Sequence, residues 1–252
     1  MTLSEALSEI VCTRHIGEFS TAVLKHGKQL RMVDHAMFLQ KAAADFQLRF
    51  VACFEEDICA GKSWEYATTC NAVSRQAGGQ AGIEACERIA ACMSRLDSAL
   101  IKEVGLRALS FFASSFGRHS RAAECRNATI RIAECCCDES GALQELNSQS
   151  LASLVNGFSK WPEEAASRQA TIAIAGEVLR RADRRARLSE FAPRRLANLV
   201  NGFSKWSKEA VSRKAIVAIA GEVLRRGDRL SHFNQQAAIG SLILISRTWR
   251  TW

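Results

Sequence analysis

Apolar residues recur in the middle of the chain at the spacing of an amphipathic helix. They follow the pattern i, i+3, i+4, i+7, i+10 at Leu151, Leu154, Val155, Phe158 and Trp161. At about 100° per residue this pattern places all five on one face, which we expect to be buried. Pro162 should end this helix. A second, alanine-rich helix is predicted from about Ala165 to Arg181.

This pair of predicted helices repeats along the chain. Asn156-Gly-Phe-Ser-Lys-Trp161 returns as Asn201-Gly-Phe-Ser-Lys-Trp206, and the stretch Ala173–Arg181 returns as Ala218–Arg226, both at a spacing of 45 residues. Weaker copies continue the repeat upstream at spacings of 42 and 43 residues. The approximate repeats are 1–60, which is degenerate, 61–103, 104–145, 146–190, 191–234 and a partial copy at 235–252.

Helix pairs of about 42–45 residues have the length of HEAT or armadillo repeats. The sequence therefore predicts an all-α fold, a single α-solenoid superhelix over residues 1–252. Composition agrees, because the chain has only 2 Pro and 15 Gly and is rich in helix-forming Ala, Leu and Arg.

The repeated residues divide into an inward and an outward set. The predicted repeat core consists of Leu154, Phe158, Trp161, Leu199, Phe203 and Trp206. The candidate interaction surface consists of Ser153, Asn156, Lys160, Asn198, Asn201, Lys205, Arg180, Arg181, Arg225 and Arg226. The arginine pairs also lie where cations suit the negative end of a helix dipole, and the repeated asparagines could instead form a structural ladder between neighbouring helices.

Two glycines recur inside the second helix, at Gly176 and Gly221. Each costs about 1 kcal/mol of helix propensity. We therefore expect both to lie at a tight contact between helices.

The cysteines show no metal or disulfide pattern. All ten lie in the first 137 residues, without a C-x-x-C pair or a histidine at zinc-ligand spacing. Because free cysteine is among the most buried residue types, we expect reduced core thiols and a reducing compartment.

Catalytic motifs are missing from the sequence. The five histidines are scattered, and neither a nucleophile elbow nor a glycine-rich phosphate loop is present. We expect no enzymatic activity and no cofactor. The longest apolar stretch, Ala237–Ile245, is much shorter than the roughly 20 residues of a membrane span, and the acidic N-terminus does not fit a Sec signal.

The words Ser159-Lys-Trp-Pro162 and Ser204-Lys-Trp-Ser207 closely resemble the SKWP-repeat family of type III secreted effectors of plant-pathogenic bacteria. The resemblance is strong over residues 104–234, and Ser207 departs from the motif. It implies a HEAT- or armadillo-like scaffold made in the bacterial cytoplasm and injected into a host plant cell, where it binds unidentified host proteins. Family members are usually longer, so we expect a short or truncated member that self-associates through an uncapped C-terminal end, or is part of a longer solenoid.

RNA is the second candidate partner. The net charge is +8, and residues 151–252 contain 18 Lys and Arg against 8 Asp and Glu. A basic solenoid can follow a phosphate backbone, and octotricopeptide repeats of plants and algae have a similar helix-pair length and Leu-Ala-Asn-Leu opening. However, a base-reading code varies from repeat to repeat, whereas Asn156 and Lys160 return unchanged. The unchanged residues favour protein–protein interaction over RNA binding.

Overall fold

The computed structural model describes residues 2–30, 32–75, 80–183 and 187–226. Within these ranges the chain forms helices and no strand, and the helices stack on their neighbours, so the predicted all-α, solenoid-type repeat fold is confirmed. The chain divides into two compact units, Met1–Cys135 and Cys136–Trp252. The predicted partial repeat at 235–252 and the last residues of the repeat at 191–234 lie outside the described residues.

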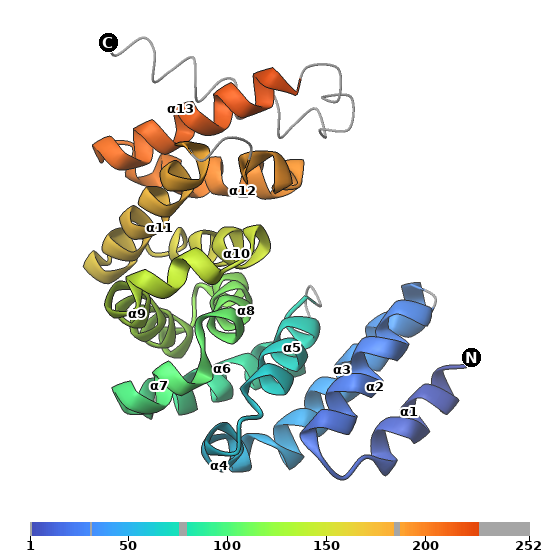
Figure 1. The fold of residues 1–252 in the computed structure, drawn as a ribbon. Helices are drawn as coiled ribbons and strands as arrows, with labels where there is room; N and C mark the ends of the chain where they lie inside the picture. The colour runs from blue at the N-terminus through green and yellow to red at the C-terminus, as the bar shows by residue number, and fades with distance from the viewer. Residues whose placement is uncertain (1, 31, 76–79, 184–186, 227–252) are drawn as a thin grey trace. The chain divides into compact units, whose positions relative to one another are not determined.

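Unit 1 consists of two layers of stacked helices (Figure 1). In one layer α2 packs on α5 and α5 on α8, and in the other α1 packs on α3 and α3 on α6. Between the layers, aromatic rings form a continuous contact in which Tyr66 lies 5.7 Å from Phe46 and 5.0 Å from Phe54. The helices are α1 Leu3–Cys12, α2 Ile16–Gln29, α3 Met32–Arg49, α4 Phe54–Cys59, α5 Ser63–Val73, α6 Gln80–Arg95, α7 Ser98–Val104, α8 Leu106–Phe116 and α9 Ala123–Asp138, whose last residues enter unit 2, with 3-10 turns η1 Val51–Cys53 and η2 Gly117–His119.

Unit 2 contains the two strongest repeats and has the same layering. The first helices of the two repeats, α10 Ser148–Phe158 and α12 Pro193–Phe203, pack on each other and form what we call the A layer. The second helices, α11 Ala165–Asp183 and α13 Ala210–Arg225, form the other layer (Figure 1). Asn147 caps α10 through its side-chain oxygen, which accepts from the Ser150 amide at 2.9 Å, and Pro193 occupies the first turn of α12.

In the structure, each described repeat after the first begins with a short helix that the sequence pattern does not predict and that starts before the predicted repeat boundary. These short elements are α4, α7, η3 Ser140–Glu145 and η4 Arg187–Glu190. In unit 2 they bury Leu143 and Leu188 at the same position of consecutive repeats. An element of four to seven residues is too short to show a helical period, so the repeat has three helical elements rather than the expected two.

The glycine prediction is wrong for Gly176 and Gly221. Both are exposed, and a Cβ atom added at either would have no neighbouring heavy atom within 4 Å. The close approach is instead at Gly202, where a Cβ would lie 2.1 Å from Cγ1 of Val155 on the neighbouring helix α10 and 3.3 Å from its carbonyl oxygen. The tight helix contact is therefore in the A layer.

Candidate interaction surface

The repeated hexapeptide lies at the C-terminal end of each A-layer helix. Its aromatic residues are buried: Phe158 and Phe203 are inaccessible, and Trp161 and Trp206 are 4% and 5% exposed. Leu154 and Leu199 are fully buried beneath them. All six residues assigned to the repeat core from the sequence thus lie in the core of unit 2.

The polar atoms of the motif make one contact between repeats and one contact within each repeat. Nε1 of Trp206 donates a hydrogen bond to the carbonyl oxygen of Pro162 in the preceding repeat at 3.2 Å. Oγ of Ser159 donates to the carbonyl of Asn156 at 2.9 Å, and Oγ of Ser204 donates to the carbonyl of Asn201 at 2.7 Å. The two serines therefore satisfy carbonyl groups that the end of each helix leaves open.

The remaining motif positions face solvent, and we call them the Asn/Lys stripe: Asn156, Lys160, Asn201 and Lys205. Lys160, Asn201 and Lys205 are exposed, and Asn156 is half-buried. Among the described residues, none of the four side chains makes a hydrogen bond or an ion pair. The alternative of a structural asparagine ladder is therefore not realised, since the amides of Asn156 and Asn201 do not bond to each other.

Ser153 and Asn198, the other two predicted A-layer surface residues, are half-buried one turn earlier in α10 and α12. They lie beside the Asn/Lys stripe rather than at its exposed end. Ser153 and Asn198 therefore expose less polar surface than Lys160, Asn201 and Lys205.

The arginine pairs have a different place from the one that the sequence suggests. Nη2 of Arg181 donates to the carbonyl oxygens of Leu143, Gln144 and Leu146, at 3.2, 3.1 and 2.7 Å, while its Nε donates to Glu177. Arg181 is only 7% exposed. Its guanidinium group therefore fastens the end of α11 to the short helix η3 of the same repeat.

Arg226 does the same in the next repeat, 45 residues later. It donates to the carbonyl oxygens of Phe191, at 2.8 Å, and Leu188, at the end of η4, and to Glu222 at 2.7 Å. We call Glu177 with Arg181, and Glu222 with Arg226, the arginine clamps. Arg181 and Arg226 belong to the internal structure of the repeat, which removes them from the candidate interaction surface.

Arg180 and Arg225 flank the clamps at the surface. Each forms two bonds to the same glutamate as its neighbour, with the Nε atoms 2.6 Å from Glu177 and 2.9 Å from Glu222. Arg225 is the more open of the two, since 61% of its side chain is exposed. Both charges are compensated within the chain and are less available to a partner than the lysines of the stripe.

These contacts also change the acidity of the glutamates. Hydrogen bonds from Arg225, opposed by partial burial and supported by Arg226, lower the pKa of Glu222. At Glu177 burial acts to raise the pKa, but the bonds from Arg180 and Arg181 outweigh it, and the pKa is lowered as well. Both carboxylates are therefore ionised in the folded protein at neutral pH.

Unit 1 has residues equivalent to the stripe that the sequence comparison missed. Counting back from Asn156 and Lys160 at the repeat spacing gives the pairs Ser114 with Arg118 and Asn71 with Arg75. In the degenerate first repeat, 50 residues further back, the corresponding pair is Thr21 with Lys25. Nη1 of Arg118 donates to Oδ1 of Asn71 at 3.1 Å and to Oγ of Ser74 at 2.7 Å. The signal was a polar residue followed four positions later by a cation, which a search for the word Ser-Lys-Trp does not detect.

The cysteines are less uniformly buried than expected. All ten are free thiols; Cys70 and Cys86, whose sulfur atoms lie 3.6 Å apart, are buried, but Cys12, Cys53 and Cys59 are exposed. The hydrogen bond between the Cys86 and Cys70 thiols, together with burial, raises the pKa of Cys86. The prediction of core thiols is wrong for these three exposed cysteines. They lie in very short helical elements or in the first helix of the stack, where neighbouring helices do not cover the thiol.

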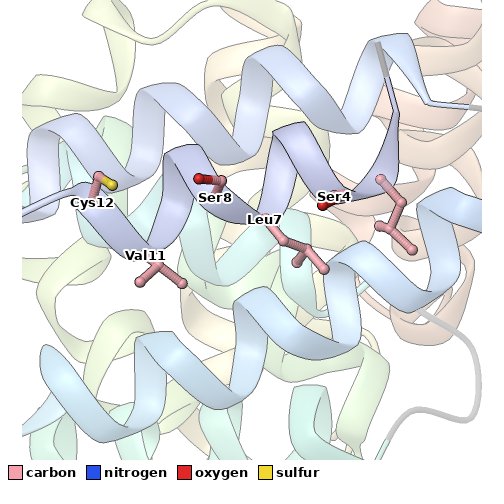
Figure 2. A pocket seen from close by; sticks show the side chains of 6 residues that line it. Ser4, Leu7, Ser8, Val11 and Cys12 are labelled. Carbon is pink, nitrogen blue, oxygen red and sulfur yellow. The ribbon is translucent and has the colours of Figure 1, made fainter.

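A shallow hollow runs along the outer side of α1 (Figure 2). All six residues that line it come from this one helix: Leu3, Ser4, Leu7, Ser8, Val11 and Cys12. A hollow lined by a single helix brings no side chains together from different elements, as a binding pocket normally does.

Two other features are missing from the described residues. These residues contain no group of three or more His, Cys, Asp or Glu side chains placed to hold a metal ion. They also contain no helix that is both long enough and apolar enough to cross a bilayer.

Comparisons of the chain with protein-family models, with curated proteins and with solved structures give no match.

Proposed function

We propose that this chain is a non-enzymatic repeat scaffold that binds other proteins, and that it acts as a type III secreted virulence effector in a host plant cell. The observation that carries the first part is the Asn/Lys stripe, whose four side chains repeat without change and have no partner within the described residues. Nothing in the packing of the repeat requires these residue types. Their repetition is explained if they contact a partner.

The second part of the proposal rests on the resemblance of Ser159-Lys-Trp-Pro162 and its copy to the SKWP-repeat effectors. The packing of the motif is compatible with this, because its Trp side chain connects successive repeats and its Ser side chain completes the end of its own helix. If the resemblance holds, we expect the motif to be needed in the family for packing between successive repeats. Secretion can be tested by comparing culture supernatants of a strain with a working type III system and an isogenic strain without one.

RNA remains the second candidate, and the repeated cation of the stripe favours it. Two observations support the protein partner instead. Arg181 and Arg226, which would have added charge to a phosphate groove, are held by Glu177 and Glu222. In addition, no aromatic side chain among the described residues is exposed as a platform on which a base could stack.

Partner capture tests the proposed function. The chain and its variant Asn156→Ala/Lys160→Ala/Asn201→Ala/Lys205→Ala would be used as baits in plant-cell extract, with and without nuclease. We expect proteins that are retained by the wild-type chain after nuclease treatment and that the variant does not retain. Capture that nuclease abolishes would contradict a protein scaffold and favour RNA.

A further inference from the structure

The Asn/Lys stripe offers the same two chemical groups at every step of the A layer. Asn156 and Asn201 each present an amide, which has both a donor and an acceptor. Lys160 and Lys205 each present an ammonium group one turn later. A surface that repeats identical groups is suited to a partner that also repeats, such as the backbone of an extended chain.

The spacing of the stripe fits an extended polypeptide. Packed helices lie about 8–10 Å apart, and α10 packs directly on α12, with Gly202 close to Val155. An extended chain rises about 3.3 Å per residue, so that one step of the stripe corresponds to about three residues. The amides can then bond to the peptide backbone and the ammonium groups to side chains at that interval.

The charges of the stripe indicate an acidic partner. Glu209 lies four residues after Lys205 in the sequence. Its carboxylate pairs with Arg168 at 3.7 Å and not with a lysine of the stripe. The same sign recurs in unit 1, where Arg118 donates to uncharged oxygen atoms of Asn71, Ser74 and Ser114. Burial, with the nearby charge of Arg75, lowers the pKa of Arg118, and within the part of the chain that the structure describes this guanidinium group has no ion pair.

Lys25 is the exception within this series. Its Nζ atom lies 3.1 Å from Glu9 on the neighbouring helix α1. In this pair Glu9 takes the place that we infer for a carboxylate of a partner at Lys160 or Lys205. The pair therefore illustrates within the chain the contact that we infer for the free lysines.

We propose that the Asn/Lys stripe of unit 2 binds an extended, acidic polypeptide segment, with Asn156 and Asn201 bonded to its backbone and Lys160 and Lys205 paired with its carboxylates. This inference rests on the proposed function and specifies the kind of protein partner. An extended segment is favoured over single-stranded RNA because the stripe supplies amides that match peptide groups and lacks an exposed aromatic ring.

The probe for a direct test is a fluorescein-labelled decaglutamate peptide, which charge repulsion keeps extended at neutral pH. Its binding to the full chain would be followed by fluorescence anisotropy at low and at physiological ionic strength. We expect Lys160→Glu/Lys205→Glu to weaken binding by about tenfold or more. We expect Asn156→Ala/Asn201→Ala, which leaves the charge unchanged, to weaken binding by about fivefold.

The matched control is Arg194→Glu/Lys214→Glu, which changes the net charge equally at two exposed positions outside the stripe. It should bind decaglutamate within about twofold of the wild-type chain once salt screens long-range attraction. Equal loss in the control would overturn the proposal, because binding would then depend on net charge alone. Unchanged binding by the asparagine variant would overturn backbone recognition. Circular dichroism of all variants checks that each remains folded.

Single-stranded decauridylate provides the competing arm. Tighter binding of this RNA than of decaglutamate, with loss in the same lysine variant, would overturn the proposal in favour of a nucleic acid. If neither probe binds, while the stripe still captures proteins from nuclease-treated extract, the acidic-segment inference fails and the scaffold function stands.

Discussion

At the scale of single residues, the hexapeptide Asn-Gly-Phe-Ser-Lys-Trp has separable roles. Phe203 fills the core, Trp206 bonds to the preceding repeat and Ser204 completes the end of its helix. Gly202 permits the neighbouring helix to approach. Packing thus explains four of the six positions, and only Asn201 and Lys205 are left for a partner.

The two kinds of glycine give opposite predictions. Gly202→Ala should destabilise the protein, because overpacking against the stiff Val155 side chain costs about 1–3 kcal/mol, more than the roughly 1 kcal/mol gained in helix propensity. Gly221→Ala, which meets no atom, should stabilise it by about 0.5–1 kcal/mol. The free energy of unfolding in urea measures both, and a stabilising Gly202→Ala would contradict the close contact.

Trp161 provides a second residue-scale prediction. Because its side chain is 4% exposed, Trp161→Ala should cost about 3–5 kcal/mol as a large truncation in the core. Trp64→Ala is a suitable comparison, since Trp64 is only half-buried and should cost less. Thermal unfolding of the two variants would test the order, and an unchanged melting temperature for Trp161→Ala would be incompatible with the structure.

At the scale of elements, the arginine clamp explains why Glu-Val-Leu-Arg-Arg recurs in both strong repeats. The second arginine of this word reaches across to the short helix that opens the repeat, and the glutamate holds both arginines in place. Arg181 also lies over the ring of Phe191 in the following repeat, 5.8 Å from its centroid. One side chain therefore connects three elements of two repeats.

The clamp should make stability depend on pH. The folded-state pKa of Glu222 is lowered, so its contribution is complete above the ordinary value of about 4.3 and is lost as pH falls through the lowered pKa. Glu222→Gln should therefore be less stable than the wild-type chain at pH 7, with a difference that shrinks in acid.

Urea unfolding at several pH values between neutral and acidic would measure this difference. The control is Glu163→Gln, which removes the same charge from an exposed side chain and should show little difference at any pH. A Glu222→Gln difference that stays constant into acid would argue against an ionised clamp.

At the scale of the whole molecule, the two compact units differ in chemistry. The cysteines lie at positions 12–137, mainly in unit 1, whereas the excess of positive charge lies after residue 150. The two strongest repeats, with both complete clamps and the free stripe, are in unit 2. We therefore expect partner binding at unit 2.

The burial of the thiols gives a prediction for the whole chain. Three of the ten cysteines are exposed, Cys12, Cys53 and Cys59, so a thiol reagent such as Ellman's reagent should label about three groups quickly in the native protein. All ten should react after denaturation. Rapid reaction of Cys70 or Cys86, identified by mass spectrometry, would show that the core of unit 1 is open.

The sequence by itself determined the all-α repeat and its buried Leu, Phe and Trp positions. These features follow from apolar spacing within one helix, which neighbouring residues specify. Exact repetition also distinguished Asn156 and Lys160 from ordinary surface residues.

Only the tertiary structure decided which glycine is packed, where the arginines point, how each repeat begins and which cysteines are covered. Each of these depends on atoms in another element, often about one repeat away in sequence: Gly202 on Val155, Arg226 on Leu188, and Trp206 on Pro162. Periodicity along one helix contains no information about such a neighbour, because the same exposed or buried position can face solvent, a carbonyl group or another helix.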